Sequence, residues 1–288
     1  MSLAYHFVSG NAYFSGGALI LAAALASLLP GVLLRVACRT ITLLGMILVL
    51  LSATPQPPLL RAVWFAVVVA WLVLDALKPA GRPTARRWLS AGVVLLSCGA
   101  MLAEVPYRLA PGVPERDYRR LYVIGDSISA GLRREREIVW PQLLRARLAG
   151  TEVINLARPG ATLSGALHQA DRVESDDALV VLEIGGNDLL AGAPASKFSE
   201  GLDALLERVR GPGRTIVMLE LPLPPLRAGY GRAQRRLAKE YGVILIPKRF
   251  FARVLAGPGN TVDGLHLSRQ GHERMAETMA SLLAPATG

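Results

Sequence analysis

Four short polar motifs in the rear half of the chain carry a serine, a glycine, an asparagine and an aspartate-histidine pair. They place Ser127 after Gly125-Asp126, Gly160 in the stretch 155–162, Asn187 after two glycines, and His266 three residues after Asp263. A serine becomes a nucleophile when an imidazole removes its proton, and a carboxylate can fix the tautomer of that imidazole. We therefore expect Ser127 to attack an ester carbonyl, His266 to act as the base and Asp263 to orient His266.

Acyl transfer also needs hydrogen-bond donors for the oxyanion that forms on the carbonyl. The backbone N–H groups of Ser127 and Gly160 and the side-chain amide of Asn187 are the donors that these motifs offer. A glycine lets a backbone N–H approach a ligand closely. We expect these three groups to form the oxyanion hole.

Apolar runs precede the motifs and are expected to position them. Short runs alternate with amphipathic stretches, which is typical of a parallel sheet whose strands are covered by helices on both faces. Ligands bind beyond the carboxyl ends of such strands, where these motifs fall. The predicted strands are 120–125, 151–156, 178–184, 214–221 and 242–246, and the predicted helices are 138–149, 162–173, 197–210, 229–241 and 269–284. The sequence thus predicts an α/β domain over 120–288.

In this order, GDSIS, the Asn-x-x-x-x-Gly of NLARPG, GGND and DGLH resemble the four blocks of the SGNH (GDSL-type) hydrolases. The resemblance covers about 120–284, and it is strongest to the thioesterase/lysophospholipase and arylesterase-like branch. It implies a flavodoxin-like three-layer α/β/α fold and metal-free hydrolysis of esters, thioesters or acetylated glycans. The family's Ser, Gly, Asn and His fall on Ser127, Gly160, Asn187 and His266, with Asp263 as the acid.

The front of the chain has a different composition. Residues 1–106 carry only seven basic and two acidic residues, in a chain that is 52% hydrophobic. Four apolar stretches, 17–34, 36–53, 60–77 and 89–105, approach the roughly 17–25 residues that span a bilayer as a helix. We expect 1–106 to form a transmembrane region of about four helices, followed by a linker at 107–119. The short second stretch leaves a re-entrant or tilted segment open, whereas the lack of Lys and Arg in 1–16 disfavours a signal peptide.

Basic residues predict which side of the membrane the rear domain occupies. The first connection carries Arg35 and Arg39, and the third carries Lys78, Arg82, Arg86 and Arg87, whereas the second carries only Arg61. Because Lys and Arg favour the cytoplasmic side, both termini and the hydrolase domain are expected outside the cytoplasm, as in a multi-pass inner-membrane protein with a periplasmic domain.

The charge and the cysteine content of the chain limit the kinds of partner and cofactor that we expect it to bind. The net charge of +10 divides equally between the two halves, and no nucleic-acid-binding signature accompanies it, so membrane lipids are the expected partners and nucleic acid is not. Cys38 and Cys98 form no metal-ligand pattern or disulfide framework. No metal and no cofactor are expected.

Other charged residues have ordinary structural interpretations. Asp126 and Asp188 are expected to be helix caps or loop braces, Asp75 and Glu104 to lie at span ends, and His168 and His272 to be solvated or packed helix residues. The charge run 133–137 and the basic residues at helical spacing are expected to be solvated and paired, with binding of an anionic group or lipid as the alternative. The apolar, proline-rich stretch 221–226 is equally consistent with a loop and with the wall of an acyl pocket. The basic residues at helical spacing mentioned above are Arg232, Arg235, Arg236 and Lys239.

The predicted activity is hydrolysis of an ester outside the cytoplasm, on an acyl lipid or an O-acylated envelope glycan. An acyltransferase would use the same residues and replace water by a sugar hydroxyl. A non-catalytic membrane scaffold is the alternative of another class. The sequence does not specify acyl length, alcohol or protein partners.

Overall fold

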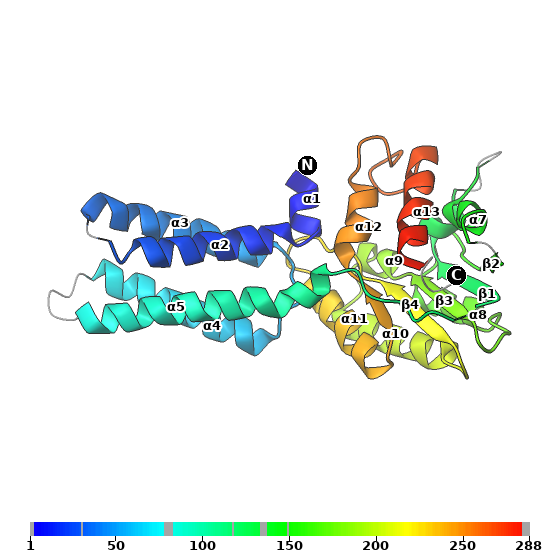
Figure 1. The fold of residues 1–288 in the computed structure, drawn as a ribbon, viewed down its shortest axis with the longest axis horizontal. Coiled ribbons are helices and arrows are strands. Elements are labelled where there is room, and N and C mark those ends of the chain that lie inside the picture. The colour runs from blue at the N-terminus through cyan, green and yellow to red at the C-terminus, as the bar shows by residue number, and fades with distance from the viewer. Residues whose placement is uncertain are drawn as a thin grey trace. The chain divides into compact units, whose positions relative to one another are not determined.

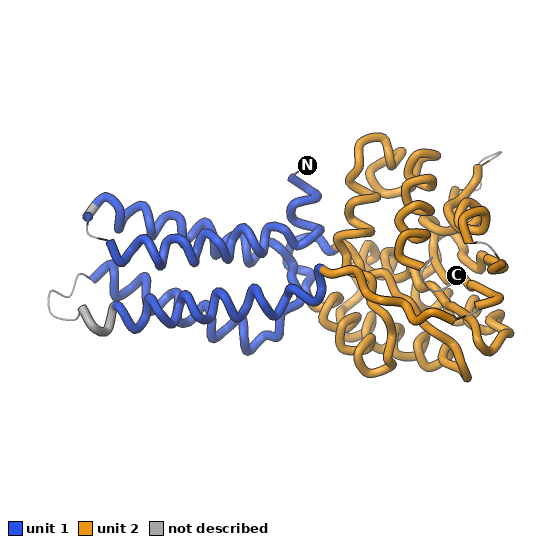
Figure 2. Tube along the Cα trace, in the orientation of Figure 1, with its two compact units in different colours: residues 1, 3–108, 223–228 blue, residues 2, 109–222, 229–288 orange. Residues whose placement is uncertain are grey.

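The computed structural model describes residues 3–29, 31–77, 83–116, 118–132, 137–148 and 150–283. The chain divides into two compact units (Figure 2). One comprises 3–108 and 223–228, and the other comprises 109–222 and 229–288.

The second unit is built on a parallel sheet of five strands in the order β2-β1-β3-β4-β5. Adjacent strands are parallel at every pairing, for example Tyr122 of β1 beside Val180 of β3. The strands are β1 (Arg120–Gly125), β2 (Glu152–Asn155), β3 (Leu179–Glu183), β4 (Thr215–Leu219) and β5 (Ile244–Ile246). Each lies within a predicted strand, and the predicted α/β fold is therefore confirmed.

Helices cover both faces of this sheet (Figure 1). On one face lie α7 (Trp140–Arg145), α12 (Lys248–Leu255) and α13 (Arg269–Leu283), and on the other lie α8 (Leu163–Ala170), α10 (Ala195–Val209) and α11 (Ala228–Glu240). Trp140, Phe251 and Met275 bring the first three helices into one apolar core with Val181 and Val217 of the sheet. Burying both faces explains why the strands read as continuous apolar runs.

Three helices of the second unit were not predicted. They are α6 (Ser127–Ala130), α9 (Gly186–Leu190) and α12. The first two are single turns, shorter than the window in which helical periodicity is visible. Both begin within three residues of the end of a strand, and both contain predicted site residues.

The first unit is a helical bundle. It contains α1 (Leu3–Val8), α2 (Asn11–Ala26), α3 (Val32–Leu51), α4 (Pro58–Ala76) and α5 (Pro83–Glu104), followed by a 3-10 turn at Val105–Arg108. Three helical segments, Leu33–Leu51, Pro58–Ala76 and Arg87–Arg108, are long and apolar enough to cross a membrane. The predicted first span at 17–34 is wrong in position, because α2 begins at Asn11, directly after Gly10 with φ +82°, and ends at Ala26. With 16 residues, α2 is shorter than a full span.

Side-chain contacts join the helices of the bundle. Gly16 and Gly45 let α2 and α3 approach so closely that a Cβ on Gly16 would lie 2.5 Å from the Gly45 carbonyl oxygen. Trp64 Nε1 donates to Ser97 Oγ at 3.0 Å. Arg39 Nε donates to the buried Asp75 carboxylate at 2.7 Å. Small residues at helix contacts and paired polar groups are typical of helices that pack within a membrane.

Candidate functional site

Ser127 stands on a one-turn helix at the carboxyl end of β1. Asp126 begins this helix, α6, and accepts the Ile128 N–H at 2.9 Å. The Ser127 N–H has no acceptor among the described residues, as is usual for the first amides of a helix. A side chain at position 125 would clash, because a Cβ on Gly125 would lie 2.8 Å from Ser129 Oγ. The turn thus places the Ser127 hydroxyl and a free amide together at the sheet edge, where Ser127 is largely buried.

Gly160 occupies the third position of a type II turn formed by residues 158–161. The Ala161 N–H donates to the Arg158 carbonyl at 3.1 Å, Pro159 fills the second position, and Gly160 has φ +74°. The Arg158 N–H donates to the Gly125 carbonyl at 3.1 Å and so fixes the turn beside the end of β1. In the described part of the chain no acceptor meets the Gly160 N–H. Glycine is needed here for its φ, since a Cβ would touch nothing within 4 Å.

Asn187 lies in α9 and connects the two preceding motifs. Its Nδ2 donates to the Ala161 carbonyl at 2.9 Å and to Asp126 Oδ2 at 3.3 Å. Gly185 starts this turn with φ +103°, and a Cβ there would lie 2.7 Å from the Phe198 ring. Both amide hydrogens of Asn187 are therefore occupied, and an oxyanion must displace or share the longer contact with Asp126.

Asp263 and His266 lie in the loop between Thr261 and Leu267, which an isolated bridge closes. Asp263 Oδ2 lies 2.6 Å from His266 Nδ1. Asp263 Oδ1 accepts the N–H groups of Leu265 at 3.0 Å and His266 at 2.8 Å. Hydrogen bonds from His266 and these amides hold the pKa of Asp263 well below its usual value. One carboxylate therefore both shapes the loop and contacts the imidazole.

The charge of His266 acts on the residue before Ser127. Burial raises the pKa of Asp126 to about 6, and the charges of His266 and Asp188 act on the same carboxyl in opposite directions. His266 therefore lies within electrostatic range of the residue before Ser127. No hydrogen bond between the Ser127 hydroxyl and the His266 ring occurs in the described residues. Such contacts are often long without substrate and tighten in the complex.

Asp126 and Asp188 act as braces. Asp126 caps α6 and holds Asn187, and Asp188 Oδ2 accepts the Leu163 N–H at 3.0 Å, which caps α8. Of the two helix histidines, His168 is exposed, whereas His272 is buried and accepts the Trp140 N–H at 3.3 Å. Desolvation lowers the pKa of His272. These four residues have the structural settings that were expected.

The basic residues of α11 are largely engaged within the domain. Arg235 is buried and donates to Glu220 at 2.8 Å, and Arg236 pairs with Glu240 at 2.9 Å. These pairs favour the structural interpretation over a lipid-binding face. Of the charge run 133–137, residues 133–136 lie outside the described residues. In the described part of the chain no group of three His, Cys, Asp or Glu residues could hold a metal ion.

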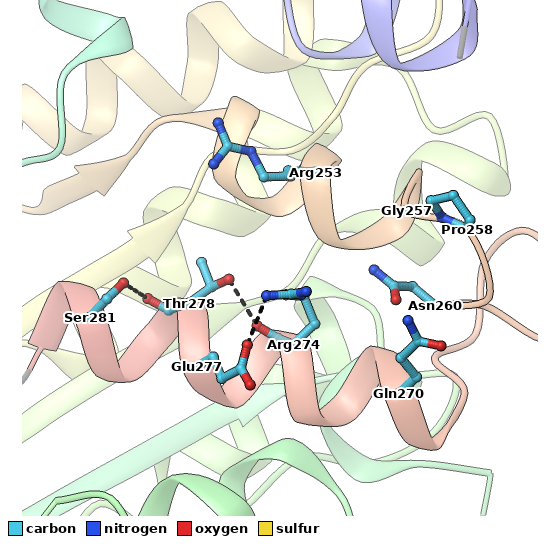
Figure 3. Close-up of a pocket in the computed structure, with 9 residues that line it drawn as sticks. All are labelled: Arg253, Gly257, Pro258, Asn260, Gln270, Arg274, Glu277, Thr278 and Ser281. Atoms are coloured by element: carbon cyan, nitrogen blue, oxygen red, sulfur yellow. Dashed lines mark hydrogen bonds and ion pairs between the residues drawn. The ribbon is translucent and has the colours of Figure 1, made fainter. Parts of the chain in front are cut away.

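A groove of about 520 Å³ lies between α12 and α13, and Figure 3 shows the side chains around it. Its lining is mostly polar and includes neither Ser127 nor His266. Asn260, at the start of the histidine loop, belongs to this lining and donates its Nδ2 to the Val254 carbonyl at 2.8 Å. The groove therefore adjoins the base of the loop and is separate from the site described above.

Sequence reasoning missed a contact between the serine turn and a buried carboxyl group. Glu183 and Ser129 are buried, and Ser129 Oγ donates to Glu183 Oε2 at 2.8 Å. The available signal was the position of Glu183, a carboxylate within the otherwise apolar strand 178–184. Because carboxylates are almost never fully buried without partners, that position indicated a specific polar contact.

A parallel α/β sheet with a serine turn, a glycine turn, an asparagine turn and an Asp-His loop defines an SGNH-type ester hydrolase. Comparison with known proteins identifies the family. Residues 123–274 match the model of the GDSL-like Lipase/Acylhydrolase family, and the chain belongs to that family.

Characterised relatives support the same class. The chain is 31% identical over 179 residues to Esterase TesA of Pseudomonas aeruginosa, covering 57% of this chain and 88% of the relative. It is 30% identical over 176 residues to Thioesterase 1/protease 1/lysophospholipase L1 of Escherichia coli K12, covering 57% and 83%. A crystal structure of TesA aligns with a TM-score of 0.52 at 30% identity, over 58% of this chain and 99% of that one. The protein is thus a serine hydrolase that acts on ester bonds.

Proposed function

We propose that Ser127, His266 and Asp263 carry out ester hydrolysis in this protein. Ser127 Oγ attacks the ester carbonyl while His266 Nε2 takes its proton, and His266 then protonates the departing alkoxide. Water, deprotonated by His266, attacks the resulting acyl-serine and releases the acid. Asp263 holds His266 Nδ1–H, which leaves Nε2 free to accept the proton. One observation carries this assignment, the 2.6 Å contact between Asp263 and a histidine close to the serine turn.

The N–H groups of Ser127 and Gly160 and Nδ2 of Asn187 would hold the oxyanion. The first two have no acceptor among the described residues, and Asn187 is tied to the Gly160 turn through the Ala161 carbonyl. Preorganised donors of this kind stabilise a developing charge without rearrangement at the moment of reaction.

Hydrolysis of short p-nitrophenyl esters by the full chain in detergent tests the assignment. Ser127→Ala should abolish turnover and labelling by a fluorophosphonate probe, because the nucleophile is gone. Ser281→Ala, which removes an exposed hydroxyl on α13, is the matched control and should behave as the parent. Full activity in Ser127→Ala would refute the assignment. Labelling of the parent at Ser127 also excludes a non-catalytic scaffold.

Membrane anchoring through the helical unit is the second part of the proposal. Only 22–28% of the residues in the three candidate spans are buried within the structure. Their outer surfaces carry apolar side chains such as Leu33, 87% exposed, and Leu95, 72% exposed. Large exposed apolar surfaces on helices indicate contact with lipid.

The side of the membrane on which the hydrolase domain is expected does not depend on whether α2 crosses the bilayer. The connection between α4 and α5 lies in a basic segment that includes Lys78, Arg82, Arg86 and Arg87, which favours the cytoplasm. Helix α5 then leads the chain to the other side, whatever the number of preceding spans. We infer that the hydrolase domain lies outside the cytoplasm. A Ser281→Cys variant lacking Cys38 and Cys98 should react with an impermeant maleimide in intact spheroplasts, and protection until lysis would contradict the orientation.

An acyl lipid or an O-acylated envelope glycan fits a tethered esterase in that compartment. Comparison of the products released from envelope extracts by the parent and by Ser127→Ala would identify the substrate. The catalytic pair is open, with the His266 side chain 25% exposed and that of Asp263 50% exposed. Water can therefore reach the acyl-serine, which favours hydrolysis over acyl transfer. Ester transfer to an added glycan that exceeds hydrolysis would reverse this preference.

A further inference from the structure

A buried carboxyl group, that of Glu183, contacts the serine turn. Glu183, at the carboxyl end of β3, is only 2% exposed. Its Oε2 accepts the Ser129 hydroxyl at 2.8 Å, and the backbone N–H of Asp126 interacts electrostatically with the same carboxyl. The two contacts lie on either side of Ser127 in the chain.

Ser129 also accepts hydrogen bonds from two other segments of the domain. Trp140 Nε1 donates to Ser129 Oγ at 3.2 Å, and Asn155 Nδ2 donates to the Ser129 carbonyl at 2.9 Å. Ser129 and Trp140 have no exposed surface. Residues from β2, β3 and α7 therefore fix a residue that lies two positions after the nucleophile.

A helix of four residues cannot hold its own geometry. Nucleating a single turn in isolation is unfavourable, so the shape of α6 must come from its surroundings. Displacing a reacting group by about 1 Å can lower a rate by about 10²-fold. Contacts that fix α6 therefore bear directly on the reactivity of Ser127.

We propose that Glu183 is a positioning residue for the nucleophile, acting through Asp126 N–H and Ser129 Oγ. The inference rests on the proposed role of Ser127. Glu183 does not touch the reacting atoms, and its effect should appear in the chemical step and leave substrate binding unchanged. Burial and the neighbouring Asp126 raise the pKa of Glu183 well above its usual value, so a neutral carboxyl fits the site.

Two substitutions separate position from charge. Glu183→Gln keeps an oxygen acceptor and has no charge, and Glu183→Leu removes both contacts at similar size. We expect Glu183→Leu to lower kcat and the rate of fluorophosphonate labelling at Ser127 by about 10²-fold, with KM within about twofold of the parent. Glu183→Gln should restore both rates to within about tenfold of the parent. Glu152→Gln, which changes a surface glutamate on β2, is the control and should leave both unchanged.

A folded Glu183→Leu protein that labels at the parental rate would overturn the inference, as would Glu183→Gln being as impaired as Glu183→Leu. If Glu183→Leu does not fold, Ser129→Ala replaces it, since it removes one contact. Labelling should then slow by about tenfold, and a parental rate overturns the inference. An active Ser127→Ala variant would instead refute the proposed function. Loss of activity in Ser127→Ala with parental labelling in Glu183→Leu refutes the positioning role alone.

Discussion

Replacing Asn187 by alanine tests the oxyanion hole most directly. The substitution removes the Nδ2 group that donates to the Ala161 carbonyl at 2.9 Å and to Asp126 Oδ2 at 3.3 Å. Loss of one oxyanion donor typically costs about 2.7–4 kcal/mol of transition-state stabilisation. In this protein the donor must first give up its contact with Asp126, so its net value is smaller.

The geometry gives the size of that correction. A hydrogen bond to a charged group contributes about 1.5–3 kcal/mol, and the long 3.3 Å distance to Asp126 places this one nearer about 1 kcal/mol. The net effect of Asn187→Ala is then about 2–3 kcal/mol, which corresponds to a fall in kcat of roughly 30- to 160-fold. Because the oxyanion forms only after attack, KM should remain close to the parental value.

The assay is steady-state hydrolysis of a p-nitrophenyl ester by the detergent-solubilised full chain, with the melting temperature measured in parallel. Asp188→Asn is the matched control, because it changes the neighbouring residue but keeps an acceptor for the Leu163 N–H. It should retain the parental kcat. A kcat for Asn187→Ala within twofold of the parent, or a loss that lies wholly in KM, would refute the assignment of Asn187 as an oxyanion donor.

Three further predictions concern the loops and a buried carboxyl. Asp263→Asn keeps an acceptor for the loop amides but presents N–H groups to His266 Nδ1, so kcat should fall by about 10²–10⁴-fold without a change in melting temperature, and parental kinetics would contradict this. Gly160→Ala and its control Gly150→Ala place a side chain at φ +74° and +79° with no clash, so each should lose about 1–2 kcal/mol of stability, but only Gly160→Ala should also lose kcat. The pKa of Asp126 is raised from 3.8 to about 6, so the folded protein holds a proton that the unfolded chain releases at lower pH, and stability should fall by about 3 kcal/mol in all as pH rises from about 3 to 7. A melting temperature with the same pH dependence in Asp126→Asn would exclude that residue as the cause.

The sequence predicted the sheet because strands buried on both faces leave continuous apolar runs, as in 178–184. It placed the serine, glycine and asparagine motifs at one sheet edge because each follows a strand, whereas the Asp-His loop follows α12. The one-turn helices α6 and α9 were not predictable from periodicity, since four or five residues contain little more than one turn. The displacement of α2 from the predicted apolar stretch has a similar origin. Hydropathy marks the apolar run 17–34, whereas the observed helix begins at Asn11, where Gly10 turns the chain.

Contacts between side chains and backbone lay beyond what spacing could give. The Asp-x-x-His pattern indicated that Asp263 and His266 are neighbours, but not that Asp263 also accepts two loop amides. Likewise, no pattern in the sequence shows that Asn187 already donates both hydrogens. These features depend on where backbone groups point after the chain folds, and several distant segments determine that together.

The same polar groups build the local structure and serve the reaction. Asp126 caps α6 and also restrains Asn187, and Asp263 shapes its loop and also contacts His266. Alanine substitutions at these positions therefore remove two functions at once, and a loss of activity would not identify its cause. Amide substitutions keep the acceptor that the backbone needs and change only the charge or the donor. The contrast between Asn and Ala at Asp126 and Asp263 thus separates the stability of each turn from its contribution to the chemical step.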